Sequence, residues 1–386
     1  MKLHKKIMLN SYAAVASLFF ERSIWSVYLV QRGFTVVEIG LLQTLLSIAM
    51  FIFETPSGIL ADKFGARFTL YLGHILNATY LLLMLILPNF SYVAIAFIAY
   101  GIGFAMISGS DQTLVYNYDN GDDYSKKIGI YNGIAIISLA FSSFLGGILS
   151  DLSWSYVFIS GIIAQVMSMI ILSGLSSRDK KDSLEEHLKF SDIFKAFRTV
   201  LLNNRSVKYL LLSIIIFQSV LSVLYNFVQL LFLEKQFSNL DISIIISIGL
   251  IFSAVSSLIM DYLNKKIGKK ILLSLFLFTL VLVGLIFMVD NIYWLLFSFL
   301  VFVFSYEFVD TTLNTVLHNH LNDKSRTFFV SFVNTLTSLL MIIANFIFTF
   351  SIKFLEVEVV FMGGTILCVI FATLFLIKYC KIKNVG

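Results

Sequence analysis

Residues 37–88 read VEIGLLQTLLSIAMFIFETPSGIL-ADKFGAR-FTLYLGHILNATYLLLMLILP, and this stretch decides the fold. Two apolar runs, 37–60 and 68–88, flank a seven-residue loop that carries three charges. A helix needs about 20 predominantly apolar residues to cross the hydrocarbon core of a bilayer, so each run is long enough. Neither run alternates apolar and polar residues as a half-buried strand would. The stretch therefore predicts two membrane-spanning helices joined by a tight polar loop.

The composition extends this prediction to the whole chain. Of the 386 residues, 58% are hydrophobic and only 13% are charged, and the mean hydropathy is +0.90. A soluble domain carries roughly 25% charged residues, so this chain has too little polar surface to cover a water-facing globule. We therefore expect an all-α integral membrane protein.

Similar apolar runs recur along the chain, separated by loops that carry turn residues and charges. The first follows Lys2, Lys5 and Lys6 and imitates a signal peptide, but we interpret it as a retained span because the apolar run continues to Val30. Twelve spans are predicted, at 8–30, 37–60, 68–88, 91–117, 128–149, 154–175, 207–233, 241–263, 270–289, 291–317, 326–351 and 356–378.

The basic residues predict the orientation of these spans. With the N-terminus in the cytoplasm, 24 of the 28 Lys and Arg residues fall on the inner side and only Arg32, Lys235 and Lys353 on the outer side. Cytoplasmic loops of membrane proteins carry such an excess. We expect a multi-pass protein of the cell (plasma) membrane, the inner membrane in a bacterium, with both termini in the cytoplasm. The net charge of +5 is then a topology signal, and it does not indicate nucleic acid as a partner.

The longest polar stretch, 176–206, divides the chain into an N-terminal six-helix bundle (1–175) and a C-terminal six-helix bundle (207–386). Two interpretations of this cytoplasmic linker remain open. It is either a plain connection or contains a short amphipathic helix on the inner membrane surface, because apolar residues fall on one side of it. Those apolar residues are Ile193, Phe194, Phe197, Val200 and Leu201.

The two halves also share a short repeat. Asp111-Gln-Thr-Leu in the fourth span and Asp310-Thr-Thr-Leu in the tenth are each followed, sixteen residues after the aspartate, by Lys127 or Arg326. Many secondary transporters are built from internal repeats, with the binding site between the two halves.

The loop between the second and third spans carries the clearest motif, GILADKFGAR at 58–67. It resembles the G-x-x-x-D-[RK]-x-G-[RK]-[RK] loop of the major facilitator superfamily, with Ala66 at one basic position. The resemblance implies the major facilitator fold, in which two pseudo-symmetric six-helix bundles of a transporter rock around a central cavity.

The same resemblance implies a conformational latch on the cytoplasmic side. Gly58 is expected to allow close helix packing, Gly65 a tight turn, and Asp62 and Arg67 a charge pair that helps to hold the outward-facing state. We also assign Glu54, near the inner surface, to this latch. The second-half counterpart, 261–270, keeps Gly268 but has a lysine where Asp62 would align, which predicts an asymmetric latch.

The fifth span is similar to that of proton-coupled drug exporters in this superfamily. Those proteins carry a glycine-rich motif that ends G-P-x-x-G-G, and here the corresponding stretch is Ser142-Ser143-Phe-Leu-Gly146-Gly147. The glycine pair is present and the Gly-Pro is replaced by two serines. The resemblance to exporters is therefore incomplete.

Ionisable residues within a span are costly and commonly functional. Glu21 and Arg22 lie in the first span, and Glu21, Trp25 and Tyr28 have the spacing of one helix face. An acid beside aromatic rings suits a cationic or amphipathic ligand through charge and cation–π attraction. The alternative is that Arg22 simply neutralises Glu21.

The seventh span carries a polar stripe. We expect it to face the first span across the cavity and to contribute to substrate binding, and hydrogen bonding between helices is the alternative. The stripe consists of Gln218, Ser222, Tyr225 and Gln229, with Asn226 adjacent.

Four acids within the spans are candidates for proton coupling: Glu21, Asp111, Glu307 and Asp310. A buried carboxyl group could load and release a proton as access alternates. Asp111 lies in the cytoplasmic third of its span and could instead belong to the latch. Glu307 and Asp310 are three residues apart and share a face.

These features predict a secondary active transporter for a small amphipathic or cationic organic molecule, with protons as the coupling ion, efflux as the direction and a monomer as the functional unit. The alternatives are a proton-coupled importer of a nutrient or metallophore, and a membrane-embedded enzyme or flippase for lipids and other amphiphiles. No catalytic, nucleotide-binding or metal-binding motif occurs, so we expect no enzyme activity, metal site or cofactor.

Overall fold

The computed structural model describes residues 2–86, 89–117, 124–175, 205–286, 291–318 and 323–385. Every regular element in these ranges is a helix. Ten stretches of the described residues are long and apolar enough to cross a membrane. The predicted all-α membrane fold is therefore confirmed. Residues 176–204 of the predicted linker, including the segment for which an amphipathic helix is one of two interpretations, lie outside the described residues, and helix α10 already begins at Arg205.

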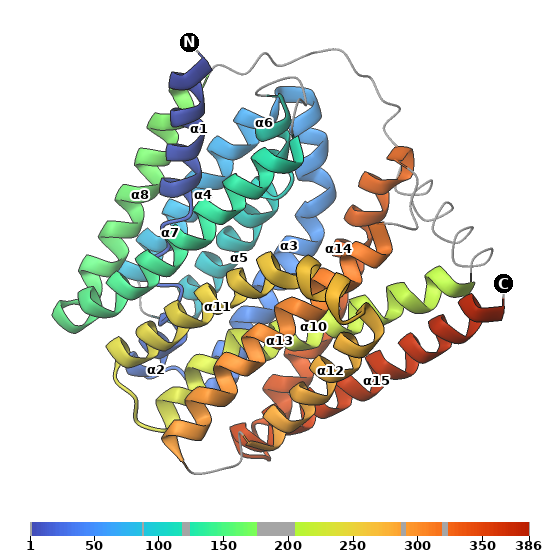
Figure 1. Cartoon of the computed structure of the whole chain (residues 1–386). Helices are drawn as coiled ribbons and strands as arrows, with labels where there is room; N and C mark the ends of the chain where they lie inside the picture. Colours follow the sequence, from blue (N-terminus) through green and yellow to red (C-terminus); the bar gives the residue numbers. More distant parts are fainter. Residues whose placement is uncertain are drawn as a thin grey trace. The chain divides into compact units, whose positions relative to one another are not determined.

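The helices pack into two compact units (Figure 1). The first unit comprises residues 1–185 together with 229–251, so it takes in the end of the seventh predicted span and the start of the eighth. Its helices are α1 (Lys2–Ala16), α2 (Trp25–Gln31), α3 (Val36–Phe64), α4 (Ala66–Ile86), α5 (Phe90–Ile107), α6 (Ser110–Asn117), α7 (Tyr124–Leu152) and α8 (Trp154–Gly174).

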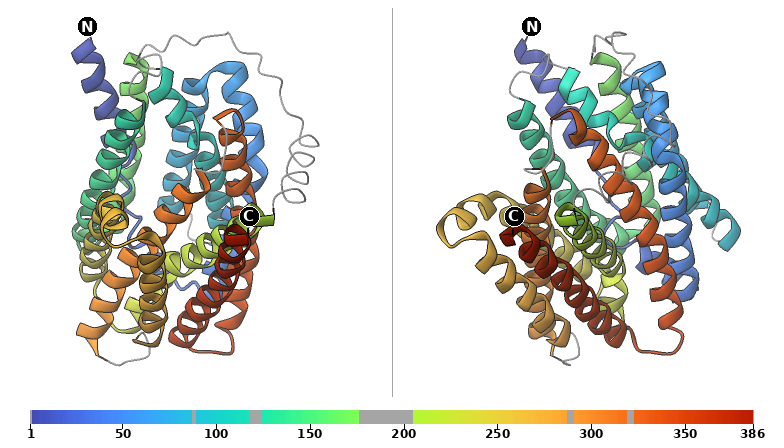
Figure 2. Two further views of the ribbon diagram at one scale, coloured as in Figure 1. Left: turned by 45° about the vertical axis from the view of Figure 1, so that its right-hand side comes forward. Right: turned by 90° about the vertical axis from the view of Figure 1, so that its right-hand side faces the viewer.

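The second unit comprises residues 186–228 and 252–386. Two long helices, α10 (Arg205–Glu234) and α11 (Asn239–Lys266), contribute to both units. Within the second unit α12, α13 and α15 run side by side, as both views of Figure 2 show. The remaining helices are α12 (Lys269–Ile286), α13 (Ile292–His318), α14 (Asp323–Ser351) and α15 (Val357–Val385).

Glycines form the predicted turns between long helices. Helix α3 ends at Phe64 and α4 begins at Ala66, and Gly65 between them has φ +88°, a conformation that costs glycine little. Gly268 does the same between α11 and α12 with φ +100°. The tight turn predicted at Gly65 is therefore confirmed.

Two predicted spans are not continuous helices. The first is divided into α1 and α2 by residues 17–24, and the fourth into α5 and α6 around Gly109, which has φ +76°. The expectation of an unbroken helix through residues 8–30 is wrong. Gly109 supplies a local reason for the second break, whereas residues 17–24 contain neither glycine nor proline. The reason for the first break must be sought in its neighbours.

Helices α3, α4 and α5 pack closely because small residues line their contacts. A Cβ atom on Gly101 of α5 would lie 2.5 Å from the Leu46 carbonyl oxygen of α3, and one on Gly103 would lie 3.1 Å from the Gly73 carbonyl oxygen of α4. In a membrane, helices associate mainly through such close backbone approach. This three-helix group forms one wall of the pocket described below.

A buried polar chain ties α1 to α4 and α8. The Tyr12 hydroxyl lies 2.8 Å from Nε2 of His74, and Nδ1 of His74 lies 2.7 Å from Oε1 of Gln165. The Gln165 oxygen can only accept, so Nδ1 of His74 donates to it. These two contacts connect α1 to α4 and α8 inside the first unit.

Candidate functional site

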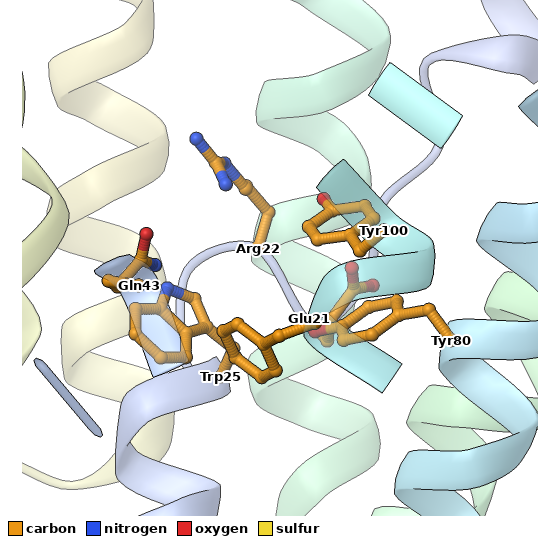
Figure 3. Close-up of a pocket in the computed structure, with 7 residues that line it drawn as sticks. Glu21, Arg22, Trp25, Gln43, Tyr80 and Tyr100 are labelled. Atoms are coloured by element: carbon orange, nitrogen blue, oxygen red, sulfur yellow. The ribbon is translucent and has the colours of Figure 1, made fainter. Parts of the chain in front are cut away.

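A small pocket lies within the first unit, formed by the segment before α2 together with α3, α4 and α5 (Figure 3). Its empty volume is about 200 Å³, including the part open to solvent. That volume counts every gap between the atoms, and no point inside it is wide enough for a water molecule, so in this structure the pocket is filled by its own side chains. It is lined by Glu21, Arg22, Trp25, Gln43, Tyr80, Phe97 and Tyr100.

Glu21 is the acidic centre of the pocket. Its side chain is 1% exposed, and neither carboxylate oxygen has a hydrogen-bond partner among the described residues. Figure 3 shows the carboxylate beside the rings of Tyr80 and Tyr100, while the Arg22 guanidinium points away from it. A buried carboxylate without hydrogen bonds is costly, because water no longer solvates its charge. A proton or a cation in the pocket would relieve that cost.

Aromatic rings enclose this carboxylate. Tyr80 and Tyr100 stack with centroids 4.1 Å apart at an interplanar angle of 10°. Phe97 meets Tyr80 and Trp25 edge to face, at 5.7 and 5.5 Å. Ring faces attract organic cations, so a carboxylate within an aromatic box has the chemistry of an ammonium-binding site.

The non-helical segment 17–24 delivers Glu21 to this pocket, and α7 holds the segment. The Phe19 amide donates to the Ser142 hydroxyl at 3.1 Å, and the Ser23 hydroxyl donates to the Ser143 carbonyl at 3.2 Å. Gly146 packs against the Phe20 carbonyl, where any side chain would overlap backbone. The serine–glycine stretch of the fifth span therefore packs against the non-helical segment of the first span and hydrogen-bonds to it.

Because the first span is interrupted, Glu21 does not share a helix face with the residues predicted to lie beside it. Trp25 lines the pocket as expected, but Tyr28 does not. The Tyr28 hydroxyl instead donates to the Met84 carbonyl at 2.6 Å, and its ring packs on Trp154 and Phe158. The predicted common face of Glu21, Trp25 and Tyr28 is wrong in this structure, because that face requires a continuous helix.

The polar stripe of the seventh span lies on α10 and is divided between the two units. Gln229 belongs to the first unit, where it is buried and binds the first span. The other four members belong to the second unit, and three of them contact another helix. Gln218 accepts from Thr337 at 3.3 Å, Ser222 lies 3.0 Å from the Tyr306 hydroxyl, Tyr225 stacks on Phe299, and Asn226 is half-buried.

Two acids of α13 form a second polar site, in the second unit. Both carboxylate oxygens of Glu307 accept hydrogen bonds, from Ser253 at 2.9 Å and from Thr311 at 3.2 Å. Asp310 accepts from Asn314 at 3.1 Å through Oδ2, whereas its buried Oδ1 has no partner among the described residues. Of this pair, Asp310 is therefore the less satisfied carboxylate.

Asp111 and Glu54 lie elsewhere in the first unit. Asp111 is in the first turn of α6, where its carboxylate accepts from the Gln112 amide at 2.7 Å. Glu54 is half-buried on α3, two residues before the proline inside that helix. Neither acid lines the pocket around Glu21.

The structure revises part of the predicted latch. A Cβ atom on Gly58 would meet no described atom within 4 Å, so the expectation that this glycine permits close packing is wrong. The Arg67 guanidinium donates to the carbonyls of Leu172 and Ser173 at 3.0 and 3.1 Å. Arg67 thus satisfies the C-terminal end of α8. The Asp62 side chain lies outside the described side chains.

Four pocket residues were missed by the sequence reasoning: Gln43, Tyr80, Phe97 and Tyr100. Gln43 offered a signal, because it is a single amide within an apolar span. The three aromatic residues offered none, since 15% of the chain is aromatic and most such side chains simply pack against other helices or lipid. Only the tertiary structure distinguishes them.

A set of apolar spans that encloses an acidic, aromatic pocket is typical of membrane transport proteins. The chain belongs to the Major Facilitator Superfamily, whose family model matches residues 11–345. The sequence resemblance based on the 58–67 loop is thereby confirmed.

Individual relatives are distant and match only part of their length. The chain is 25% identical over 150 residues to YxaM, an uncharacterized MFS-type transporter of Bacillus subtilis. The matched region covers 39% of this chain and 38% of YxaM. It is 24% identical, again over 150 residues, to the quinolone resistance protein NorA of Staphylococcus aureus, covering 38% and 39%. The chain thus spans well under half of these two proteins.

Solved structures resemble the chain over nearly its full length. A mutant of the nucleoside transporter NupG superposes with a TM-score of 0.81 at 14% identity, covering 98% of this chain and 99% of that one. The inward-open xylose transporter XylE from E. coli superposes with a TM-score of 0.69 at 13% identity, covering 97% and 96%. At these identities the likeness shows the fold alone.

Proposed function

We propose that this transporter exports a small amphipathic or cationic organic molecule in exchange for protons, by alternating access. The observation that carries the proposal is the Glu21 carboxylate, which is buried in an aromatic pocket and has no hydrogen-bond partner in the part of the chain that the structure describes. Such a group is stable only when a proton or a cation balances its charge. Exchange of the two at one carboxylate would link substrate release to proton uptake.

The lining of the pocket supports a particular class of substrate. The aromatic rings and the Glu21 carboxylate suit a compact ammonium group, and the side chains that fill the pocket here would move apart to admit it. We therefore infer an amphiphile whose cationic head enters between Trp25 and the tyrosine pair, while its apolar part remains outside. Arg22, at the edge of the same pocket, would disfavour a second positive charge near the head.

Asp310 is our second candidate for proton coupling. Its Oδ1 is buried and has no hydrogen-bond partner among the described residues, whereas both oxygens of the neighbouring Glu307 accept hydrogen bonds. A proton on Asp310 would satisfy that oxygen without rearranging the Glu307 contacts. Each compact unit would then contain one acid that can load and release a proton.

The direction and orientation are part of the proposal. The partial similarity to the quinolone resistance protein NorA supports efflux. The excess of basic residues in alternate loops supports cytoplasmic termini in a plasma membrane, and we propose that the protein acts as a monomer.

The test is proton movement in proteoliposomes that contain a pH-sensitive dye. Lipophilic cations, neutral drugs and peptides are added in turn, and Glu21→Gln, Asp111→Asn, Glu307→Gln and Asp310→Asn are compared with wild type. The exposed Asp151→Asn serves as the control. We expect cations to drive proton flux that Glu21→Gln abolishes.

Other outcomes would point to other functions. Proton flux with a nutrient or metallophore, accompanied by cellular accumulation, would indicate import. No flux with any compound, together with scrambling of labelled lipid in vesicles, would indicate a flippase.

A further inference from the structure

The first span is interrupted at residues 17–24, SLFFERSI, although nothing in that octapeptide ends a helix. Glycine and proline are absent, and the apolar run continues on both sides. The backbone bonds within the segment are short-range turns, such as the Arg22 amide to the Phe19 carbonyl at 3.3 Å. In a membrane every backbone group needs a partner, so the interruption persists only where other helices supply one.

Gln229 of α10 supplies partners for two backbone groups, the Ser26 amide and the Arg22 carbonyl. Its Oε1 accepts from the Ser26 amide at 3.2 Å and from the Ser26 hydroxyl at 2.8 Å, and its Nε2 donates to the Arg22 carbonyl at 2.9 Å. In a continuous α-helix the Ser26 amide would donate directly to the Arg22 carbonyl, four residues earlier. The Gln229 carboxamide therefore stands between the donor and the acceptor of one helical hydrogen bond.

The start of α2 confirms that the interruption is imposed from outside the segment. Its N-cap residue is Ile24, which makes no side-chain cap hydrogen bond. Isoleucine is among the poorest N-cap residues, and ordinary caps satisfy the second or third amide of the helix. Here Ser26 provides that second amide, and the cap comes from Gln229 of another helix.

Two serines complete the hold on the segment. Ser142 accepts from the Phe19 amide, and the Ser23 hydroxyl lies 3.0 Å from the hydroxyl of Ser243 at the start of α11. Gln229 and Ser243 both come from residues 229–251, the part of α10 and α11 that packs within the first unit. The contacts that hold the segment thus come from α7 and also from α10 and α11, in the second half of the sequence.

We propose that Gln229 is a positioning residue that holds the first span unwound, and that the span winds into one continuous helix when Gln229 withdraws. Winding closes the Ser26–Arg22 hydrogen bond and brings Glu21, Trp25 and Tyr28 onto one face. Glu21 then leaves the position it occupies beside the stacked rings of Tyr80 and Tyr100. This inference rests on the proposed function in one respect, because alternating access is what would withdraw Gln229.

Hydrogen exchange of residues 17–26 tests this, and it needs neither a substrate nor a proton gradient. Gln229→Leu keeps the approximate size of the side chain but removes all three hydrogen bonds. If the segment winds into a helix, its amides should exchange about tenfold more slowly in the variant than in wild type. Unchanged or faster exchange would overturn the proposal, because a merely structural contact leaves a looser segment when it is removed.

Two further variants keep the test decisive. Gln43→Leu removes a buried amide from the same pocket without touching the Ser26–Arg22 pair, and it should leave exchange at 17–26 unchanged. Gln229→Glu keeps an acceptor for Ser26 but offers Arg22 no donor when ionised, so exchange should fall between wild type and Gln229→Leu. If Gln229→Leu does not fold, the same comparison is made with Gln229→Asn, which is too short to bridge both groups.

A transport measurement separates this inference from the proposed function. Gln229→Leu should reduce turnover of a cation at least several-fold while the protein still binds it, since only the change of state is impaired. If exchange is slower in Gln229→Leu but the wild-type protein transports no cation, the result would support winding of the first span and reject the proposed cationic substrate. Transport that is normal in Gln229→Leu, with exchange unchanged, would reject winding and leave the substrate proposal intact.

Discussion

Gly146 of α7 packs directly against the carbonyl group of Phe20, so closely that a Cβ atom at this position would overlap the Phe20 backbone. This contact explains why one glycine of the fifth span matters to the first span. The Phe20 carbonyl lies in the non-helical segment that leads into Glu21. The fit between Gly146 and Phe20 therefore controls where the acidic group of the pocket lies.

We expect Gly146→Ala to lower the free energy of unfolding by about 1–3 kcal/mol, the usual cost of overpacking. The atoms nearest to that Cβ are the O, C and Cα atoms of Phe20, which no change of rotamer can move aside. Thermal unfolding in detergent measures the effect. Gly133→Ala on the same helix is the control, because its Cβ would meet nothing within 4 Å. Equal melting temperatures for both variants would show that the segment adapts freely.

We expect Glu21→Gln to lose transport of organic cations and to retain transport of neutral compounds. Glutamine preserves the shape of the side chain but provides no negative charge to attract an ammonium group. Uptake by inverted vesicles measures both substrate classes, and Asp151→Asn at the exposed end of α7 controls for nonspecific effects. Equal loss of cationic and neutral transport would reject a cation-selecting role for Glu21.

We expect Asp310→Asn to abolish substrate-driven proton movement and Glu307→Gln to leave most of it. The reason is that no described residue bonds the Asp310 Oδ1, whereas hydroxyl groups already donate to both Glu307 oxygens. Internal pH in proteoliposomes is the readout. The opposite pattern, in which only Glu307→Gln abolishes the flux, would assign the proton to Glu307.

We expect Arg67→Ala to destabilise the protein by about 1.5–3 kcal/mol, the range for hydrogen bonds to a charged group. Arg67 holds the last carbonyls of α8, and alanine leaves both without this donor. Thermal unfolding again provides the measurement, with the exposed Lys63→Ala as the matched control. Unaltered stability in Arg67→Ala would mean that water replaces the guanidinium at no cost.

We expect Asp62→Asn to slow turnover while the melting temperature stays the same. Its position in the 58–67 loop predicts a role in the change between the outward-facing and inward-facing conformations. We do not expect that role to contribute to folding. Turnover and thermal unfolding are measured on the same preparation. Unchanged turnover would indicate that this loop does not act as a latch here.

The sequence by itself determined the class of fold and most element boundaries. An apolar run that is long enough to cross a bilayer, and that lacks the alternating pattern of a β-barrel strand, crosses as an α-helix. The helix satisfies each backbone hydrogen-bonding group within the same segment. Gly65 and Gly268 predict turns for a similarly local reason, since glycine adopts positive φ at little cost. Glu21 could be predicted as a site residue because a carboxylate in an apolar span is rarely accidental.

Only the tertiary structure decided how the first span is interrupted and what surrounds Glu21. Residues 17–24 have no local signal for a break, and the groups that hold them come from α7, α10 and α11. The same limit applies to Tyr80, Phe97 and Tyr100, which differ from many other aromatic residues only in what they contact. Hydrogen bonds between residues some two hundred positions apart, such as those of Ser26 and Gln229, depend on packing that no local pattern encodes.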